Sequence, residues 1–243
     1  MKVIPVIDVL NGVAVHGIRG ERERYQPLKS ILCKSADPLD IASTFGSLGF
    51  SSLYLADLDA ILGRSSNFNI YRQIMTQTSL DLMVDAGIAG ITKAEKVLAT
   101  EVSKIVIGSE TLDSLDFLGQ AVKAFGEDKI VVSIDLKEGK VLSASEAIAS
   151  MDAVSFAQEL GKIGVKHIIL LDLDRVGTEH GINWALLRRV LAKTGVEVLV
   201  GGGIRSLQEL LELRKLGVSG ALVATILHNG KLEVAELKSA SFL

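Results

Sequence analysis

Short apolar runs alternate with amphipathic stretches from one end of the chain to the other. Runs rich in Val, Ile and Leu are typical of buried parallel strands, and the stretches between them repeat apolar residues at helical spacing. The predicted strands are Val3–Ile7, Ser52–Asp57, Asp81–Val84, Lys104–Ile107, Ile130–Ile134, His167–Leu171, Val196–Val200 and Gly220–Val223. The clearest predicted helices are Asp40–Leu48, Thr92–Leu98, Val154–Ile163, Trp184–Ala192 and Leu207–Leu216. This alternation indicates βα units and a parallel sheet.

The number of predicted strands favours a closed barrel. Eight strands with helical crossovers in 243 residues fit an α/β fold of the (β/α)8 or TIM-barrel type better than an open doubly wound sheet. No stretch rich in Pro, Gly and Ser separates two parts of the chain. We therefore expect residues 1–243 to form a single barrel domain.

The chain also repeats itself. Leu55-Ala56-Asp57-Leu58-Asp59 recurs 115 residues later as Leu170-Leu171-Asp172-Leu173-Asp174. Val84–Ile88 aligns with Val200–Ile204 at a spacing of 116 residues, and Ile7-Asp8 aligns with Ile134-Asp135 at 127. Matching strand ends at a spacing of 115 or 116 residues, and of 127 for the first strand, indicate two (β/α)4 half-barrels fused in one chain. The extra residues of the first half fall in its first βα loop, residues 10–38, which is long enough to be a lid over the site.

Composition narrows the functional classes. A net charge of −3, with no stripe of basic residues and interleaved aromatics, argues against nucleic-acid binding. The lone cysteine, Cys33, excludes an internal disulfide and a multi-cysteine zinc site. No apolar run is long enough to span a membrane, and the N-terminus has no signal-like segment, so we expect a cytoplasmic protein. The four histidines show no metal-ligand spacing.

Catalytic chemistry is expected where strands end, because barrel enzymes place reacting groups at the C-terminal ends of their strands. Asp8 and Asp135 end the first and fifth predicted strands, which lie opposite each other in an eight-stranded barrel. Two carboxyl groups that flank a substrate can act as general acid and general base. Each aspartate alone is better explained as a cap of the following turn. The symmetric pair favours catalysis.

Phosphate binding is predicted after the last two strands. Gly201–Gly203 follow a buried strand and precede a helix, and Ala224-Thr225 follow the next strand. Backbone N–H groups in such loops hold anions, so we expect Gly202, Gly203, Ala224 and Thr225 to bind phosphate. The glycines could also serve only a tight connection. In the first half Asp85 stands in the equivalent loop and would repel a phosphate. Further candidate site residues are Asp85, Gly108, Ser109, Asp172 and Thr178.

Together these motifs resemble the histidine-biosynthesis barrels, namely ProFAR isomerase and, more distantly, the cyclase subunit of imidazole glycerol phosphate synthase. The resemblance covers nearly the whole chain and is carried by four motifs, Ile4–Asp8 with Asn11-Gly12, Tyr54–Asp59, Ile134-Asp135 with Gly139–Val141, and Val200–Ser206. It implies an isomerase that converts an aminoaldose into an aminoketose in an Amadori rearrangement. It also implies Asp8 and Asp135 as the acid/base pair, a phosphorylated small-molecule substrate, and no metal or organic cofactor.

The chain departs from the family pattern at the positions that grip a long bisphosphate. Asp85-Ala86-Gly87 replaces a glycine-rich phosphate loop, and Leu171 and Val176 replace polar residues of the strand-6 loop. Val13 and His16 replace basic residues, and Ser143–Ala147 replace an R-G-W-like segment. One alternative is a divergent paralogue that acts on a singly phosphorylated metabolite, in which Lys137 could form a Schiff base. Another is a non-catalytic partner subunit. The sequence leaves the oligomeric state open.

Overall fold

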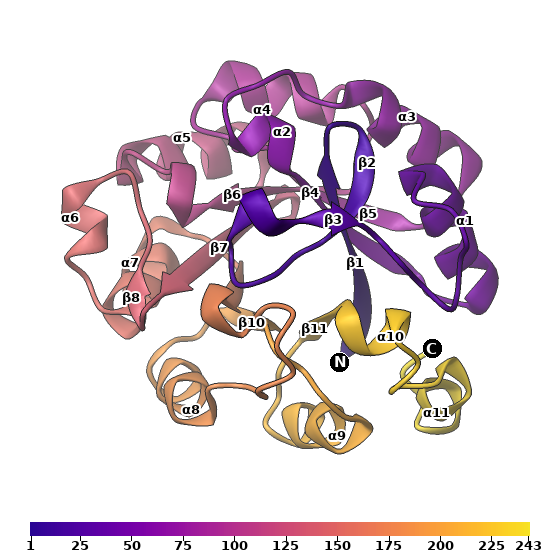
Figure 1. Cartoon of the computed structure of the whole chain (residues 1–243). Helices are drawn as coiled ribbons and strands as arrows, with labels where there is room; N and C mark the ends of the chain where they lie inside the picture. The colour runs from indigo at the N-terminus through magenta and orange to yellow at the C-terminus, as the bar shows by residue number, and fades with distance from the viewer.

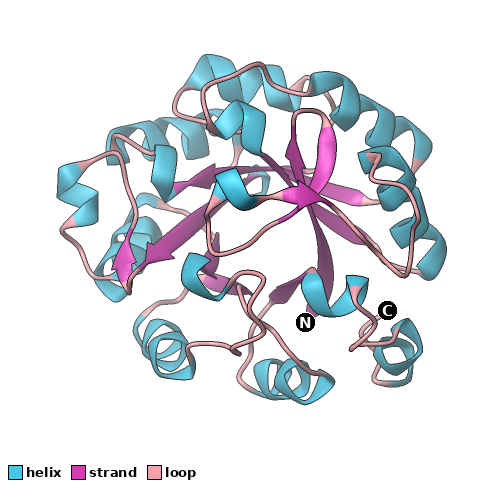
Figure 2. Ribbon diagram, viewed as in Figure 1, coloured by secondary structure: helices cyan, strands magenta, loops and turns pink.

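Eight parallel strands close into a barrel in the computed structural model, which describes residues 1–243 (Figures 1 and 2). Each strand pairs with the next around the ring, and the last pairs with the first in the register Lys2 to Gly220. The strands are β1 (Lys2–Leu10), β4 (Ser52–Asp57), β5 (Asp81–Asp85), β6 (Lys104–Gly108), β7 (Ile130–Lys137), β9 (His167–Asp172), β10 (Glu197–Gly201) and β11 (Gly220–Val223). The predicted (β/α)8 barrel is confirmed.

The helices form an outer layer around this barrel (Figure 2). The longer ones are α1 (Pro38–Leu48), α3 (Phe68–Gln77), α4 (Ile91–Leu98), α5 (Leu115–Phe125), α7 (Ala153–Ile163), α8 (Trp184–Lys193), α9 (Leu207–Lys215) and α11 (Val234–Ser239). Short turns of helix, α2 (Leu58–Ile61), α6 (Glu146–Ala149), α10 (Thr225–His228), η1 (Arg22–Arg24), η2 (Ser109–Thr111), η3 (Glu127–Lys129) and η4 (Leu173–Arg175), lie in the loops.

The internal repeat extends to the helix caps. The Asp37 carboxylate accepts from the first backbone N–H groups of α1, and Gly49 ends that helix in the left-handed conformation. Asp152 and Gly164 do the same for α7. The two aspartates are 115 residues apart, and so are the two glycines, which is the spacing found for the strand-end motifs. An aspartate N-cap and a glycine C-cap therefore fix the same helix in each half.

Side chains of the strands alternate between two apolar regions. In β4, Leu53 and Leu55 belong to the large core between strands and helices, whereas Tyr54 and Ala56 belong to a smaller cluster that fills the barrel interior. This alternation follows from the two-residue period of a strand. It places Tyr54 inside the barrel, directed toward the mouth that the loops cover.

Two strands are longer than predicted because they continue into hairpins. We expected the first and fifth strands to end at Ile7 and Ile134, but β1 runs on to pair with β2 (Val13–His16) and β7 with β8 (Lys140–Val141). β2 also pairs with the short β3 (Gln26–Pro27). The turns use positive φ at Asn11-Gly12 and Glu138-Gly139. Asn-Gly is the strongest short hairpin signal, so the first of these could have been predicted.

Candidate active site

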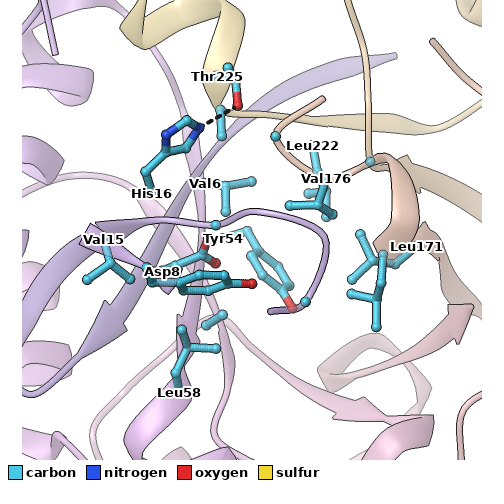
Figure 3. Close-up of a pocket in the computed structure, with 18 of the residues that line it drawn as sticks. Val6, Asp8, Val15, His16, Tyr54, Leu58, Leu171, Val176, Leu222 and Thr225 are labelled. Atoms are coloured by element: carbon cyan, nitrogen blue, oxygen red, sulfur yellow. Dashed lines mark hydrogen bonds between the residues drawn. The ribbon is translucent and has the colours of Figure 1, made fainter. Parts of the chain in front are cut away.

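A cavity of about 270 Å³ lies at the C-terminal ends of the strands, where the sequence predicts the active site (Figure 3). Three carboxyl groups from three different strands line it, Asp8 of β1, Asp85 of β5 and Asp135 of β7. Tyr54 lies among them, with 4% of its surface exposed. The structure thus brings the predicted acid/base pair, Asp8 and Asp135, into one cavity and adds Asp85 to it.

Burial makes these carboxyl groups hard to ionise. It raises the pKa of Asp8 to about 7 and that of Asp135 to about 6. Burial and the neighbouring Asp135 together raise the pKa of Asp85 to about 7. Low-dielectric surroundings disfavour the charged form of a carboxyl group, and a second carboxylate nearby adds repulsion. Each of the three carboxyl groups therefore gains or loses its proton near neutral pH.

The hydrogen-bond partners of Asp8 and Asp135 differ. Asp135 accepts hydrogen bonds from the Ser133 hydroxyl at 2.6 Å and from the Glu110 backbone N–H at 3.2 Å, and its own N–H donates to the Ser109 hydroxyl at 2.9 Å. The donors to the carboxyl group favour its ionised form. No such donor acts on Asp8, where only the charge of Arg22 opposes the effect of burial. Asp135 therefore ionises at lower pH and is better suited to act as a base, whereas Asp8 keeps its proton to higher pH and is better suited to act as an acid.

Glycine at position 108 lets two of the carboxyl groups approach each other. A Cβ atom there would stand 3.1 Å from an Oδ2 atom of both Asp85 and Asp135. The two oxygens are therefore no more than about twice that distance apart. Gly108 does not line the cavity, and Ser109 lies behind it, where its hydroxyl donates to the Leu142 carbonyl at 2.8 Å. These two predicted site residues shape and hold the aspartates from outside the cavity.

The long first loop lies across the mouth. Arg22 of η1 forms a 2.5 Å ion pair with Glu110 after β6. The Lys137 amine donates to the Arg19 carbonyl at 2.8 Å and pairs with Asp174 at 3.0 Å, and the Arg19 N–H donates to the Val176 carbonyl at 3.0 Å. These contacts join the loop to both halves of the barrel. We call this set of contacts the clasp.

The cavity is also lined by all four residues predicted to bind phosphate, which directly follow β10 and β11. These are Gly202, Gly203, Ala224 and Thr225. The backbone N–H groups of Gly202, Gly203 and Ala224 have no hydrogen-bond partner within the chain. Gly202 and Gly203 have φ of +92° and +83°, and a Cβ on Gly202 would overlap the Asp172 carbonyl oxygen. The glycines thus serve a tight loop connection and also leave unpaired backbone donors on residues that line the cavity.

The remaining predicted residues lie outside the cavity. Asp172 accepts from the Arg175 guanidinium at 2.9 Å, and the Thr178 hydroxyl donates to the Arg175 carbonyl at 2.8 Å, so both fix the loop after β9. The repeat partner of Asp172, Asp57, is fully buried and accepts from the Ala60 N–H, the Asn67 N–H and the Tyr71 hydroxyl. The Asp57 and Asp172 pair therefore braces loops.

The lining residues that sequence reasoning did not select include Arg22, Tyr54, His16 and His228. Tyr54 had a usable signal, because it alternates with the outward-facing Leu53 and Leu55 of its strand. The His16 ring lies 3.2 Å from the Thr225 hydroxyl although 209 residues separate them, a contact that only the closed barrel creates (Figure 3). No helix of the chain has the length and apolar character needed to cross a bilayer.

Known proteins resemble this chain over its whole length. The family model described as "Histidine biosynthesis protein" matches residues 2–233. An uncharacterized protein of Methanocaldococcus jannaschii is 35% identical over 240 residues, which cover 98% of this chain and 97% of that protein. A Streptococcus sanguinis protein named 1-(5-phosphoribosyl)-5-((5-phosphoribosylamino)methylideneamino)imidazole-4-carboxamide isomerase is 33% identical over 243 residues, covering 99% and 98%. A Streptococcus thermophilus protein of the same name is 32% identical over 242 residues, covering 98% and 99%.

Proposed function

Since the chain belongs to the family of histidine biosynthesis proteins, we propose that it is an isomerase that converts a phosphorylated aminoaldose into the aminoketose through Asp8 and Asp135. The observation that carries this proposal is the pair of buried carboxyl groups with different hydrogen-bond partners in one cavity. Relatives that carry an isomerase name at 32–33% identity support the same reaction class. The reaction needs a group that gives a proton and a group that removes one, and no redox partner.

The proposed steps use the two groups in turn. Protonated Asp8 donates its proton to the ring oxygen of the sugar, which breaks the bond between that oxygen and C1 and gives an open-chain iminium ion. Ionised Asp135 then removes the proton on C2, and the electron pair of that bond forms the C1–C2 double bond of an enolamine. Return of a proton to C1 and loss of the O2 proton give the ketose, with all atoms conserved. General acid–base catalysis of this kind contributes roughly 10²–10⁴-fold for each group.

The phosphate of the substrate is placed at Gly202, Gly203, Ala224 and Thr225. Three unpaired backbone N–H groups and one hydroxyl line that end of the cavity. Backbone donors that lack a partner inside the protein are a natural anion site. Asp8 and Asp135 line the same cavity, so a bound phosphate would anchor the sugar beside them.

The test is an isomerase assay with the compound after which the Streptococcus relatives are named. Asp8→Asn and Asp135→Asn should each lower kcat by at least about 100-fold while leaving the thermal unfolding transition cooperative. Asp113→Asn, an exposed residue, is the matched control and should turn over like the wild type. Normal turnover in either active-site variant would contradict the proposed mechanism. A stable complex from cell extract with no turnover alone would favour a partner subunit.

A second candidate is a related reaction on a smaller substrate with one phosphate. A cavity of about 270 Å³ lies below the roughly 300–1,000 Å³ typical of ligand pockets, and Asp85 stands where the second phosphate would bind. Binding of a single phosphate equivalent per chain, without turnover of the bisphosphate, would favour it. A Schiff base at Lys137 would require the amine to leave its partners at the rim. A borohydride-trapped adduct lost in Lys137→Ala would reveal one.

A further inference from the structure

His228 is a buried histidine with a free ring nitrogen. It retains 5% exposure, lines the cavity, and its Nε2 atom has no hydrogen-bond partner. A buried polar atom without a partner costs free energy that a bound ligand can recover. This nitrogen lies at the end of the cavity formed by Thr225, the first residue of the same helical turn. The Val6 backbone carbonyl also acts on this ring and favours its protonated form, but it makes no hydrogen bond of standard geometry with Nε2, so this nitrogen can still serve a ligand group.

The neighbouring hydroxyl indicates which nitrogen carries the proton. Ser30 Oγ lies 2.8 Å from His228 Nδ1 and accepts a hydrogen bond from the Leu32 N–H at 3.1 Å. We assign this contact as a hydrogen bond that the Ser30 hydroxyl donates to Nδ1. The proton of the neutral ring then sits on Nε2, which makes the free nitrogen a donor. A donor is what an anion requires.

His16 provides a second imidazole at the same place. Its Nε2 atom lies 3.2 Å from the Thr225 hydroxyl (Figure 3). A positive charge on His16 would also act on His228. Burial lowers the pKa of both histidines, that of His228 to about 4, so both are neutral in the empty protein near pH 7. A dianion between them would favour their protonated forms. Neither ring has a carboxylate partner within hydrogen-bonding distance.

Other charged groups around this end are already engaged or differently placed. Glu179, after β9, pairs with Lys231 at 2.5 Å and accepts from Asn229 at 2.8 Å. Asp8 belongs to the carboxyl cluster, and Lys29, next to Ser30, is exposed. No lysine or arginine lines the cavity on the segments that carry the phosphate-binding residues. Imidazoles therefore stand where many phosphate sites use a permanent cation.

We propose that His16 and His228 complete the phosphate end as proton-dependent donors, so that binding of a phosphate monoester dianion is coupled to proton uptake by the protein. This inference rests on the proposed function, because it uses the phosphate end defined there. It adds two specificity-determining residues and makes anion affinity sensitive to pH. An uncharged ligand of the same shape would gain nothing from the bound proton.

The test uses inorganic sulfate, which remains a dianion between pH 5.5 and 8.5, so any pH dependence comes from the protein. Titration calorimetry of the wild-type chain should show sulfate affinity falling by up to about tenfold per pH unit as pH rises, with proton uptake seen by comparing buffers. His16→Gln should weaken binding and flatten this dependence. His180→Gln, an exposed loop histidine outside the cavity, is the matched control and should match the wild type.

His228→Gln is the second variant, and imidazole NMR titration of the wild type follows all four histidines without any substitution. The resonances of His16 and His228 should titrate at higher pH with sulfate than without it. Sulfate binding that is independent of pH, or unchanged in both variants, would overturn this inference and leave the phosphate end intact. No sulfate binding at any pH would overturn the phosphate end and this inference together. Isomerase turnover tests Asp8 and Asp135 separately.

Discussion

The carboxylate of Asp85 accepts a 3.0 Å hydrogen bond from the backbone N–H of Gly87, two residues further along the same loop. This loop is the first-half counterpart of the loop at Gly201–Gly203, whose donors are unpaired. In the first half the chain's own carboxylate therefore occupies a donor that a phosphate would use. Glu110 lines the cavity nearby and adds a second negative charge. The two ends of the cavity have different chemistry although the halves share a fold.

Removing this internal carboxylate should create a second anion site. In the double variant Asp85→Gly with Glu110→Gln, the Gly87 N–H is freed and two negative charges are removed. We expect calorimetry to give two sulfate ions per chain, against one for the wild type. The double variant Glu146→Gln with Asp113→Asn, at two exposed positions outside the cavity, is the control for the charge change. A count of one in the double variant would contradict this explanation of the lost site.

Asp85→Asn should stabilise the fold at alkaline pH. Asp85 is 7% exposed, and its pKa is raised from 3.8 to about 7, so folding disfavours its ionised form. The cost is absent below pH 4, grows as pH rises, and is complete above pH 7. Removing the charge should therefore raise the free energy of unfolding by about 2–4 kcal/mol at pH 8, and by much less at pH 5. Urea unfolding of this variant and of Asp113→Asn at both pH values measures the difference.

The pH dependence of kcat/KM should be a narrow bell. In the proposed mechanism Asp135 must be ionised, so the rate should rise with pH through about 6, and Asp8 must be protonated, so the rate should fall above about 7. Ser133→Ala removes the 2.6 Å hydrogen bond to Asp135 and should move only the acid limb, toward higher pH. A flat profile up to pH 9 would show that Asp8 is not the acid.

Arg22→Gln should move the other limb. Arg22 is the cation that lowers the pKa of Asp8, so its loss should shift the alkaline limb to higher pH. The substitution also breaks the 2.5 Å ion pair with Glu110. Arg24→Gln is a matched control on the same helical turn, because Arg24 pairs only with Glu21 at the surface. Equal shifts in the two variants would indicate a general charge effect.

Gly202→Ala and Gly12→Ala separate close packing from backbone strain. Both glycines have positive φ, +92° and +75°, but only at Gly202 would a Cβ meet backbone atoms. We expect a loss of about 2–4 kcal/mol in unfolding free energy for Gly202→Ala and about 1 kcal/mol for Gly12→Ala. Denaturant unfolding of both variants decides this, and equal losses would mean that the loop at Gly202 moves aside.

Most of the barrel could be predicted because its strands are apolar runs with clear ends. Ser52–Asp57 and Gly220–Val223 match the predicted bounds. The error at Ile7 and Ile134 arose because an aspartate, Asp8 or Asp135, interrupts each apolar run, although β1 continues through Val9-Leu10 and β7 through Leu136-Lys137. Polar residues at a barrel mouth pair through their backbone, which periodicity does not detect.

The candidate site was only partly predictable for a different reason. Asp8 and Asp135 stand at repeated strand ends, so each could be identified from its own neighbours along the chain. The pairs Arg22 with Glu110 and His16 with Thr225 join residues 88 and 209 positions apart. Their chemistry depends on loop paths that no local pattern encodes. The role of Asp85 could be predicted in part. The sequence shows that a carboxylate replaces the glycine-rich loop, but not that this carboxylate accepts a hydrogen bond from the Gly87 N–H.

The clasp across the mouth has a kinetic consequence. It ties the first loop to both halves through Arg22, Arg19 and Lys137, so the loop is held over part of the mouth. If substrate entry requires these contacts to break, we expect the association rate constant to fall below the diffusion-limited range in proportion to the fraction of time in which they are broken. The same contacts would then slow the departure of a bound substrate. Slow entry is thereby coupled to a high probability that each encounter ends in reaction.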